Sequence, residues 1–397
     1  MLRTDLENSS DIRPQKTPLR EVPHIVIEPN QTCNLRCRSC YNLDRDHVKS
    51  LDRIREEIDL ARRKRNLDTV SLLGGEPTLH PRIGDIVSYV KSMGLICQML
   101  TNGIVFLDPM RAGLLDDLVN AGLDRIVLHA DTGQQRPGTR LESFCESVFD
   151  RFEQRRIPFS LSITLYPENR GTLPDLMTQY ARYRFFDGIL ATLVKDPRNT
   201  AQQPADRAAG ADILEEHEAI VRRLRILPAA YIPSSLDDSF ISWLMYFYTL
   251  NTRTGATFGV SPRFNRLFRK GYRLLAGRYA FGMTSDPSQF KVTCLLSGIA
   301  EVLLSPSRLP SFLRLIRDSS AMDALRFHYI VIQSGPEWNA KHGKVQICHH
   351  CPDATIRNGK ITPVCIADLI NPILPAKPSR SSDEGLRQTV YAHLEEE

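Results

Sequence analysis

The sequence predicts an α/β protein built on a partial (β/α)6 TIM-like barrel, followed by a mainly helical insert and a small C-terminal module rich in cysteine. Three observations support this fold class. Between residues 22 and 195, short β-rich runs alternate with amphipathic stretches of ten or more residues, which is typical of βαβ units and a parallel sheet. Six such units are too few to close an eight-unit barrel. After residue 212 the alternation stops, and aromatic and arginine residues become more frequent.

The elements of the barrel follow one another in a regular order. Strands are expected at 24–29, 69–75, 95–103, 124–131, 159–167 and 187–194. The helices between them are expected at 50–65, 81–93, 110–121, 142–155 and 171–183. The basic run at 62–65 closes the first helix, where cations complement the helix dipole, and we expect it to be solvated. In such barrels the chemistry lies in the loops that follow the strands.

Changes in composition set the expected domain boundaries. We expect an N-terminal tail over 1–21, the barrel over 22–195, a Pro-, Ala- and Gln-rich linker over 196–212, an aromatic and basic helical insert over 213–290, an auxiliary module over 291–368 and a C-terminal tail over 369–397.

The composition excludes several classes of protein. The chain has 397 residues, of which 42% are hydrophobic and 24% charged, so wholesale disorder is excluded. Its first residues carry acids and no apolar core, so they do not predict a signal peptide. No run of about 18 apolar residues predicts a membrane span. A formal charge of +5 is too small to indicate a nucleic-acid partner, and we expect a cytoplasmic protein.

Nine cysteines are many for a protein of the reducing cytoplasm, and six of them fall in two clusters. Cys33, Cys37 and Cys40 form a C-x3-C-x2-C triplet after the first expected strand. Clustered cysteines in such proteins more often bind metal or act in catalysis than form disulfides. Three thiolates can hold three corners of a [4Fe–4S] cluster and leave the fourth iron open. The alternative is zinc, with His24 or His47 as a fourth ligand.

The triplet and the sequence Gly74-Gly75-Glu76-Pro77 after the second expected strand together resemble the radical S-adenosylmethionine (SAM) superfamily over residues 22–195. The resemblance implies that the triplet holds a [4Fe–4S] cluster, whose open iron is chelated by the amine and carboxylate of SAM. It also implies that Gly74, Gly75, Glu76 and Pro77 hold the methionine amino group. Glycines allow a close approach of the backbone, and a glutamate can pair with an amine.

The resemblance implies further SAM contacts at the ends of later strands. The expected contacts are Asn102 after the third strand, Asp131 after the fourth, and Ser162 and Thr164 near the end of the fifth. One position departs from the family pattern, which usually has an aromatic residue just before the third cysteine. This chain has Ser39 there and Tyr41 after the cysteine, so we expect different packing on the adenine side.

A second group of cysteines lies near the C-terminal end of the sequence. Cys348, Cys351 and Cys365 form a C-x2-C-x13-C pattern, and Cys294 is an upstream candidate for a fourth ligand. Alone, this pattern fits a zinc ribbon completed by Cys294 or a histidine. Beside the first triplet it resembles the auxiliary SPASM or twitch-type modules of radical SAM enzymes, which implies a cluster-binding module with a second [4Fe–4S] cluster. With Cys294 that cluster would be closed and relay electrons; without it, an open iron could bind substrate.

The C-x2-C-x13-C pattern also resembles the molybdenum-cofactor GTP cyclase. The arginine-rich stretch that follows the second cysteine in that enzyme is replaced here by residues 352–356, and only Arg357 remains. We therefore expect a different specificity.

Residues 240–281 are rich in aromatic and basic residues and are compatible with a subdomain that caps the substrate or with contact to a membrane surface. Residues 262–281 contain six basic residues and no acid, with apolar residues at helical spacing, as in helices that lie on anionic membranes. Residues 240–248 are nearly all apolar and aromatic, as in a buried aromatic helix, and too few to span a bilayer. Alternatively, both segments form the core and surface of a subdomain that caps the substrate. A hydrophobic substrate fits this composition better than a nucleotide.

These patterns predict a radical SAM enzyme that cleaves SAM reductively to a 5′-deoxyadenosyl radical and abstracts hydrogen from an organic substrate. The expected partners are a small-molecule, lipid or peptide substrate and a one-electron reductant such as flavodoxin or ferredoxin. The alternatives are a GTP-cyclase-like rearrangement of a nucleotide and a non-catalytic iron–sulfur or zinc scaffold. Cys97 and Cys145 stand alone and are expected to be ordinary core residues.

Overall fold

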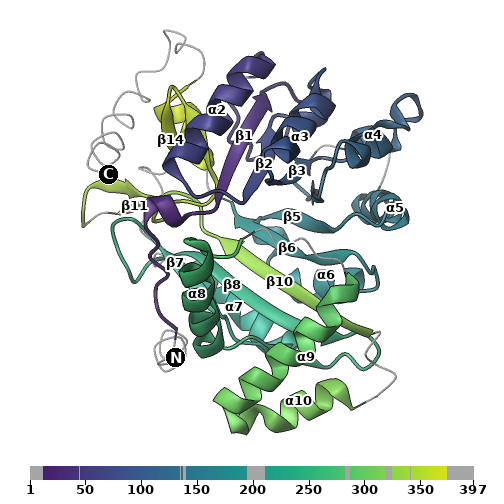
Figure 1. The fold of residues 1–397 in the computed structure, drawn as a ribbon, viewed down its shortest axis with the longest axis vertical. Coiled ribbons are helices and arrows are strands. Elements are labelled where there is room, and N and C mark those ends of the chain that lie inside the picture. Colours follow the sequence, from purple (N-terminus) through teal and green to yellow (C-terminus); the bar gives the residue numbers. More distant parts are fainter. Residues whose placement is uncertain are drawn as a thin grey trace.

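A curved, mainly parallel sheet forms the centre of the protein, and helices α2 to α6 cover its outer face (Figure 1). The computed structural model describes residues 12–43, 45–134, 136, 140–194, 211–281, 287–317, 324–339 and 341–372. The strand order is β14-β13-β1-β2-β3-β4-β5-β6-β10-β8-β7, with β9 paired to β8. The predicted α/β fold with a partial barrel is confirmed.

The six predicted strands and the five predicted helices between them are present in the predicted order. The strands are β1 (His24–Asn30), β2 (Thr69–Gly74), β3 (Ile96–Thr101), β4 (Arg125–His129), β5 (Phe159–Leu165) and β6 (Phe186–Leu193). The helices are α2 (Leu51–Lys64), α3 (Ile83–Ser92), α4 (Leu114–Asn120), α5 (Leu141–Gln154) and α6 (Leu173–Tyr180). Helix α2 shows why these segments form: Ser50 caps it by accepting a hydrogen bond from Arg53 N, and Ile54, Ile58 and Ala61 bury one face.

The prediction of a mainly helical insert is wrong for residues 230–259. The elements after the barrel are α7 (Ala211–Leu224), β7 (Ala230–Pro233), β8 (Ile241–Asn251), β9 (Thr257–Gly259), α8 (Pro262–Ala276), α9 (Pro287–Leu304) and α10 (Leu309–Ile316). The segment expected as an aromatic helix is strand β8, which is almost wholly buried. Periodicity cannot separate a buried strand from a buried helix in a continuous apolar run.

The sheet continues past the sixth strand through β10 (Leu325–Gln333). This strand runs parallel to β6 and antiparallel to β8. A Cβ at Gly188 in β6 would lie 2.3 Å from Tyr329 O in β10, so the pairing requires glycine at this position. The barrel therefore gains a seventh parallel strand and an antiparallel edge that the sequence pattern did not predict.

One segment joins the two edges of the sheet and makes the barrel nearly closed. The remaining elements are β11 (Glu337–Asn339), β12 (Lys344–Gln346), β13 (Ala354–Arg357), β14 (Lys360–Pro363) and α11 (Ala367–Ile370). Ser235 N donates to Ile347 O (2.7 Å) and His349 N to Pro233 O (3.0 Å), next to β7. At the other edge, Thr355 of β13 pairs with β1. We call residues 347–357 the seam segment.

The chain ends differ in how far they are described. Part of the expected N-terminal tail packs on β7, where Gln15 N donates to Tyr231 O (2.8 Å). Most of the expected linker, and the C-terminal tail beyond residue 372, lie outside the described residues. Leu369 and Ile370, at the start of that expected tail, are buried. Among the described helices, none has the length and apolar character that crossing a bilayer requires.

Candidate functional site

The first cysteine loop lies between β1 and α2, at the carboxyl end of the first strand. Cys33, Cys37 and Cys40 are partly buried there and form no disulfide. Burial, followed by the neighbouring Cys40 thiol, Asp131 and the Cys33 thiol, raises the pKa of Cys37 to about 12. The three sulfur atoms therefore share one small region. A cationic cluster would favour the thiolates instead, since thiolates are the usual ligands of iron–sulfur clusters.

The donor set of this loop fits a cubane cluster with one open corner. In the described part of the chain, no group of three or more His, Cys, Asp or Glu side chains already stands in a metal-binding arrangement. Cluster binding therefore requires the thiols to turn toward a common centre. Three contacts oppose this rotation: Leu35 N lies 3.5 Å from Cys33 Sγ, Cys40 Sγ lies 3.7 Å from Asn42 O, and the Cys37 thiol is hydrogen-bonded to Gln134. Hydrogen bonds to sulfur are weak.

Other strand ends hold the cysteine loop in place. Asn34 Oδ1 accepts a hydrogen bond from Asn102 Nδ2 (2.7 Å), which follows β3. Arg38 N donates to Gly133 O (2.8 Å) beyond β4, and Cys37 forms a β-bridge with Gln134. The structure thus brings the loops after β1, β3 and β4 together on one rim of the barrel.

The two glycines after β2 pack against the backbone that leads into the cysteine loop. A Cβ at Gly75 would lie 2.1 Å from Thr32 O and 2.5 Å from Gln31 O, and one at Gly74 would lie 2.4 Å from Asn30 O. Gly75 N also donates to Asn30 O (2.8 Å). We expected the glycines to allow approach to a ligand, but the close neighbour in the structure is the chain itself. This turn fixes the root of the cysteine loop.

Glu76 is buried, and both of its carboxylate oxygens accept hydrogen bonds within the protein. Its Oε1 accepts from Thr78 Oγ1 (2.6 Å) and Thr101 Oγ1 (2.7 Å), and its Oε2 accepts from Asn102 N (2.7 Å). Burial raises the pKa of Glu76, although these hydrogen bonds favour its ionised form. Pro77 begins the short 3-10 helix that carries Thr78. The carboxylate therefore ties the β2 turn to the end of β3.

Asp131, which follows β4, links two strand ends through hydrogen bonds, as Glu76 does. Its Oδ1 accepts from Gly133 N (2.8 Å) and its Oδ2 from Thr164 N (2.9 Å) at the end of β5. His129 Nε2 lies 3.4 Å from Oδ2, and His129 Nδ1 lies 3.1 Å from Ser162 Oγ. The expected residues of β4 and β5 thus lie together, with Asp131 linking the two strand ends.

Tyr166 is a residue of this rim that the sequence pattern did not reveal. Its hydroxyl is hydrogen-bonded to Ser39, and the Arg38 guanidinium lies 4.7 Å from the centre of its ring. An aromatic ring from the end of β5 therefore lies beside the third cysteine, where the loop itself has a serine. Tyr41 points elsewhere, with its hydroxyl 3.5 Å from Gly74 O. The available signal was that Tyr166 directly follows β5, on the rim where the other strand ends meet.

The second cysteine site is in the seam segment and the helical turn after β14. Cys348 Sγ lies 3.2 Å from Cys351 Sγ, and neither thiol forms a disulfide. The Cys348 thiol, then burial and the Cys365 thiol, raise the pKa of Cys351 well above its usual value. Burial and the Cys348 thiol also raise the pKa of Cys365. The structure therefore places Cys365 near the Cys348–Cys351 pair, although these described side chains do not yet stand in a metal-binding arrangement. Three cysteines in one region fit an iron–sulfur or zinc site.

Arg65 supports this second site, although its position in a basic run predicted a solvated side chain. It is 1% exposed, and its guanidinium donates to Cys351 O (2.9 Å) and to His24 O (2.6 Å). Burial lowers the pKa of Arg65 to about 10. His24, which we considered as a ligand for the first site, lies here instead, with Nδ1 donating to Pro352 O (3.0 Å).

The structure does not bring Cys294 to the other three cysteines. Cys294 lies on α9, and its thiol is hydrogen-bonded to Thr249 on β8. Cys348 instead pairs with Ser234 at the end of β7, next to the start of β8 near Trp243. Thr249 and Trp243 are six residues apart on β8, which is about 20 Å along an extended strand. Cys294 therefore lies at the far end of this strand.

A cavity of about 510 Å³ lies inside the ring of strands. Its lining includes Val26, Leu73, Leu100, Val127, Trp243 and Tyr329. Arg125 and Asp187 also line it and form an ion pair with each other. The chamber is therefore mostly apolar, and its charged lining from the sheet is internally balanced.

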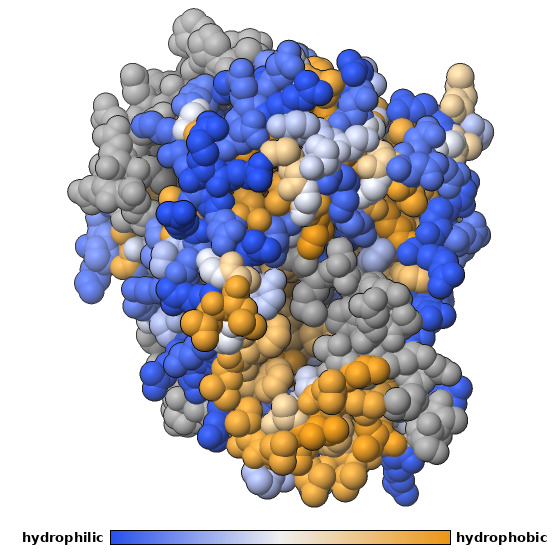
Figure 2. Space-filling view, viewed as in Figure 1, coloured by the Kyte–Doolittle hydropathy of each residue, from blue (hydrophilic) through white to orange (hydrophobic). Residues whose placement is uncertain are grey.

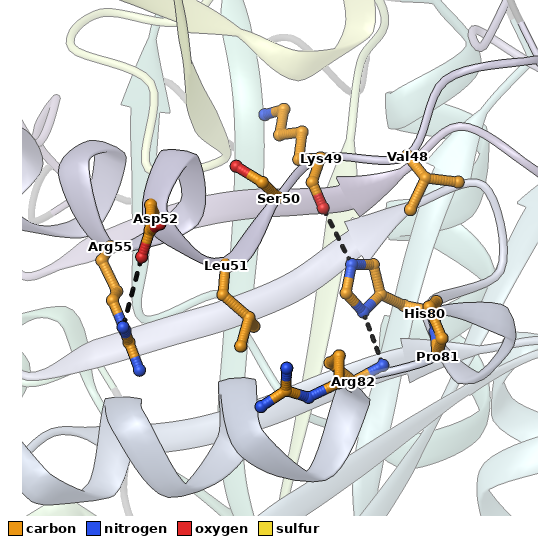
Figure 3. Close-up of a pocket in the computed structure, with 9 residues that line it drawn as sticks. All are labelled: Val48, Lys49, Ser50, Leu51, Asp52, Arg55, His80, Pro81 and Arg82. Atoms are coloured by element: carbon orange, nitrogen blue, oxygen red, sulfur yellow. Dashed lines mark hydrogen bonds and ion pairs between the residues drawn. The ribbon is translucent and has the colours of Figure 1, made fainter.

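A second pocket, of about 480 Å³, lies outside the barrel at the start of α2 (Figure 3). Arg55 there pairs with Asp52 (3.3 Å), and His80 Nε2 lies 3.0 Å from Lys49 O. None of the expected site residues lines this pocket. The two cysteine sites and the central cavity remain the candidate functional centre.

Comparison with known proteins agrees with this geometry. The model of the radical SAM superfamily matches residues 27–178. A tungsten-containing aldehyde ferredoxin oxidoreductase cofactor-modifying protein of Pyrococcus furiosus is 28% identical over 44% of this chain and 51% of its own length. A PqqA peptide cyclase of Xanthomonas euvesicatoria is 24% identical over 38% of this chain and 42% of its own. A GTP 3′,8-cyclase of Chlorobaculum tepidum is 33% identical over 34% of this chain and 39% of its own.

The similarity is confined to part of each protein. The chain spans about half, or less, of the length of these curated relatives. Among solved structures, Streptococcus suis SuiB bound to the precursor peptide SuiA aligns over 56% of this chain and 49% of its own, at 16% identity and a TM-score of 0.41. The match to the radical SAM superfamily model covers residues 27–178, which include the first cysteine loop and the strand ends that hold it.

Proposed function

We propose that the protein is a radical SAM enzyme with two metal centres, one on the rim of the barrel and one at the seam. Cys33, Cys37 and Cys40 would hold a [4Fe–4S] cluster, and SAM would lie beside it on the same rim. When bound, such a cluster supplies the electron that cleaves SAM to methionine and a 5′-deoxyadenosyl radical, which takes hydrogen from the substrate.

The observation that carries this proposal is the joining of four strand ends at the cysteine loop. The β2 turn packs on the root of the loop, Asn102 bonds to Asn34, and residues 133 and 134 pair with Arg38 and Cys37. The ring of strands that carries this rim also encloses the apolar cavity. Leu73 and Leu100 line the cavity within two residues of Gly74 and Asn102, so the cavity begins below the rim, whose own proposed site residues do not line it.

Glu76, Asn102, Asp131 and Thr164 contribute to this proposal in a way that differs from the sequence expectation. Their polar atoms are engaged within the protein. We therefore assign them the positioning of the cysteine loop and of the neighbouring backbone groups, which would present SAM with donors and acceptors in fixed places.

The second centre is proposed to hold a metal cluster on Cys348, Cys351 and Cys365 only. Cys294 is left out because its thiol bonds to Thr249 at the other end of β8. Three protein ligands would leave one position of a cubane cluster open. In this arrangement the second centre would be able to bind substrate as well as transfer electrons.

The cavity favours an apolar substrate over a nucleotide. Two arginines line the cavity: Arg125 of the sheet, which Asp187 neutralises, and Arg269 of α8, which donates to Thr17 Oγ1. A nucleoside triphosphate would need several free cations for its phosphates. The GTP-cyclase alternative is therefore less well supported, even though one relative is a GTP cyclase. Other relatives are named peptide cyclases, and a peptide with apolar side chains remains a candidate alongside a lipid. The reductant would be a flavodoxin or ferredoxin of the cytoplasm.

Metal analysis of the anaerobically reconstituted protein tests both centres. We expect about eight irons per chain for the parent and about four for each of Cys37→Ala and Cys348→Ala, because each centre holds four irons. Cys145→Ala is the matched control, since Cys145 is a buried core residue of α5 far from either group in sequence, and it should retain about eight. One or two zinc ions per chain without iron would contradict the proposal.

Cleavage of SAM tests the activity itself. With dithionite as the reductant, the parent and Cys145→Ala should form 5′-deoxyadenosine, while Cys37→Ala should form at least about 100-fold less because its cluster is lost. Equal product from Cys37→Ala and the parent would refute the enzyme assignment. A Cys348→Ala variant that still cleaves SAM but has lost about four irons would place the cleavage at the first centre.

A further inference from the structure

The exposed apolar side chains of the protein are concentrated on three helices. Fourteen large apolar residues are exposed in the described part of the chain; four of them lie on α8, four on α9 and two on α10. They are Leu267, Phe268, Leu274, Leu275, Val292, Leu296, Ile299, Leu303, Leu309 and Leu313. We call these ten residues the apolar face. Figure 2 shows apolar side chains gathered over the part of the molecule where α8, α9 and α10 lie. On a soluble protein, a large exposed apolar patch marks a site that binds a protein, a membrane or a ligand.

The charges around the apolar face are almost all positive. Helix α8 carries five basic residues and no acid, and Arg263 and Lys270 are exposed on it. Arg314 and Arg317 are exposed at the end of α10. The one acid of the three helices, Glu301, is buried and paired with Arg308 (2.5 Å). Apolar side chains beside cations, without exposed acids, are the arrangement with which amphipathic helices bind anionic lipid surfaces.

The apolar face is continuous with the cavity of the barrel. Phe264 and Phe268 of α8 and Leu296 and Ser297 of α9 line the cavity. Two of these, Phe268 and Leu296, are also 45% and 61% exposed, so they belong to the outer surface and to the chamber at the same time. The mouth of the cavity therefore opens between α8 and α9, within the apolar face.

We propose that the apolar face lies on an anionic membrane surface, and that the cavity takes the long apolar chain of a lipid through the mouth between α8 and α9. The second part rests on the proposed function, because it names the substrate class of the same chamber. A soluble peptide would need hydrogen-bonding partners along its backbone. The polar side chains that α8 and α9 add to the cavity lining are Asn265, Arg269 and Ser297, and the first two already donate to Ala229 O and Thr17 Oγ1. Lateral entry from the bilayer would spare an apolar chain any passage through water.

Binding to vesicles tests the docking without any cofactor chemistry. Sedimentation of the protein with vesicles of phosphatidylcholine and phosphatidylglycerol (3:1) should exceed sedimentation with phosphatidylcholine alone, and Leu274→Glu/Leu275→Glu should weaken it at least about 10-fold. These two side chains are 86% and 89% exposed, so the variant should fold. Met110→Glu is the matched control, because Met110 is 92% exposed but lies before α4, outside the apolar face.

A second double variant, with its own control, tests the basic side chains of α8. Arg263→Glu/Lys270→Glu on α8 should weaken binding to the anionic vesicles and reduce its dependence on salt, while Arg63→Glu/Lys64→Glu on the exposed side of α2 should leave both unchanged. Vesicle binding that none of the α8 variants changes would overturn the docking. A dimer that forms through Leu274 and Leu275 in the absence of vesicle binding would also overturn it.

Entry of a lipid chain is tested by tryptophan fluorescence, because one of the two tryptophans lines the cavity. Trp243 lies in the cavity, and Trp338 lies on β11. In a Trp338→Phe variant, vesicles with brominated acyl chains should quench the fluorescence of Trp243 relative to the same vesicles without bromine. A Trp243→Phe variant, which retains Trp338, should show no such difference.

The outcomes separate this inference from the proposed function. Equal fluorescence with and without bromine would refute lipid entry, even if SAM is cleaved normally. Vesicle binding and quenching in a protein that never forms 5′-deoxyadenosine would refute the enzyme proposal and leave the lipid site standing.

Discussion

At Gly75 the structure leaves no room for a side chain, and the consequence is testable. A Cβ would meet Thr32 O and Gln31 O at 2.1 and 2.5 Å, and both atoms belong to backbone that cannot swing aside. We expect Gly75→Ala to lower the free energy of unfolding by about 3 kcal/mol, the upper end for overpacking, and to reduce iron binding at the first site. Thermal unfolding and iron content measure both effects.

Gly84→Ala provides the control for this prediction. Gly84 lies within α3, and a Cβ added there would have no neighbour within 4 Å, so alanine should stabilise the helix by up to about 1 kcal/mol. A Gly75→Ala variant with the stability and iron content of the parent would show that the loop root is not fixed by this contact.

Because His24 is buried in its neutral form, we expect the folded protein to lose stability at acidic pH. Burial, with a smaller effect of the Arg65 cation, lowers the pKa of His24 from 6.5 to about 3. The native state then binds fewer protons than the unfolded state between these values, so stability is lost as the pH falls below 6.5. At pH 5 the loss from this one group is about 2 kcal/mol.

A His24→Gln variant should therefore lose less stability than the parent between pH 7 and pH 5, whatever its stability at pH 7. Chemical denaturation at the two pH values measures the difference. His342→Gln, at an exposed turn residue, is the control and should follow the parent. A His24→Gln variant with the same pH dependence as the parent would show that His24 is not held neutral.

At the scale of single residues, the sequence predicted which positions meet on the rim better than what each side chain does there. The triplet and the residues after β2, β3 and β4 were placed by the rule that parallel strands end on one rim. Glu76, however, bonds to Thr101 and Asn102 within the protein, a pairing that only the fold could define. Arg65 and Tyr166 were missed because their roles depend on contacts with distant segments.

At the scale of elements, a local pattern was sufficient for the six βα units and insufficient for β8. In these units amphipathic helices alternate with short strands, and the spacing of apolar residues differs clearly between the two. In β8, both faces are buried, one against the cavity and the other against the core, so no polar face marks its period. Its partner β10 lies more than 70 residues further along the chain. The residues around β8 therefore carry no pattern from which this pairing could be predicted.

The β13–β14 hairpin is held on the barrel by one buried charge network. Arg357 donates to both carboxylate oxygens of Glu28 (2.8 Å each) and lies 2.9 Å from Asp368. We expect Arg357→Met to cost about 3–5 kcal/mol, because it leaves two buried carboxylates without their cation. Denaturant unfolding measures the cost.

A double variant separates the charge effect from lost packing. Glu28→Gln/Arg357→Met should be less destabilised than the sum of the two single variants, by about 1–3 kcal/mol. Arg55→Met removes a solvent-exposed partner of Asp52 and should cost no more than about 1 kcal/mol. Strict additivity of the Glu28 and Arg357 variants would show that the network does not hold the hairpin.

At the scale of the whole molecule, the seam segment turns an open sheet into a nearly closed ring. It bonds to β7 on one side and leads into β13 beside β1 on the other, and it carries Cys348 and Cys351. The sequence predicted the metal-binding pattern of these cysteines but not their position, because the position depends on β7 and β10, which the pattern did not show. A metal at this site would therefore also be a structural clamp on the barrel.

Hydrogen exchange tests the clamp. The amides of Ser235 and His349 bond across the seam, and in the reconstituted protein they should exchange at least about 10-fold more slowly than after metal removal, because opening the seam then requires loss of the metal ligands. Cys348→Ser/Cys351→Ser should exchange as the metal-free parent does. The amides of β3 and β4, in the middle of the sheet, serve as the internal control and should not respond. Seam amides that exchange equally with and without metal would show that a metal at the second site does not close the barrel, and would leave electron transfer or substrate binding as the proposed role of this site.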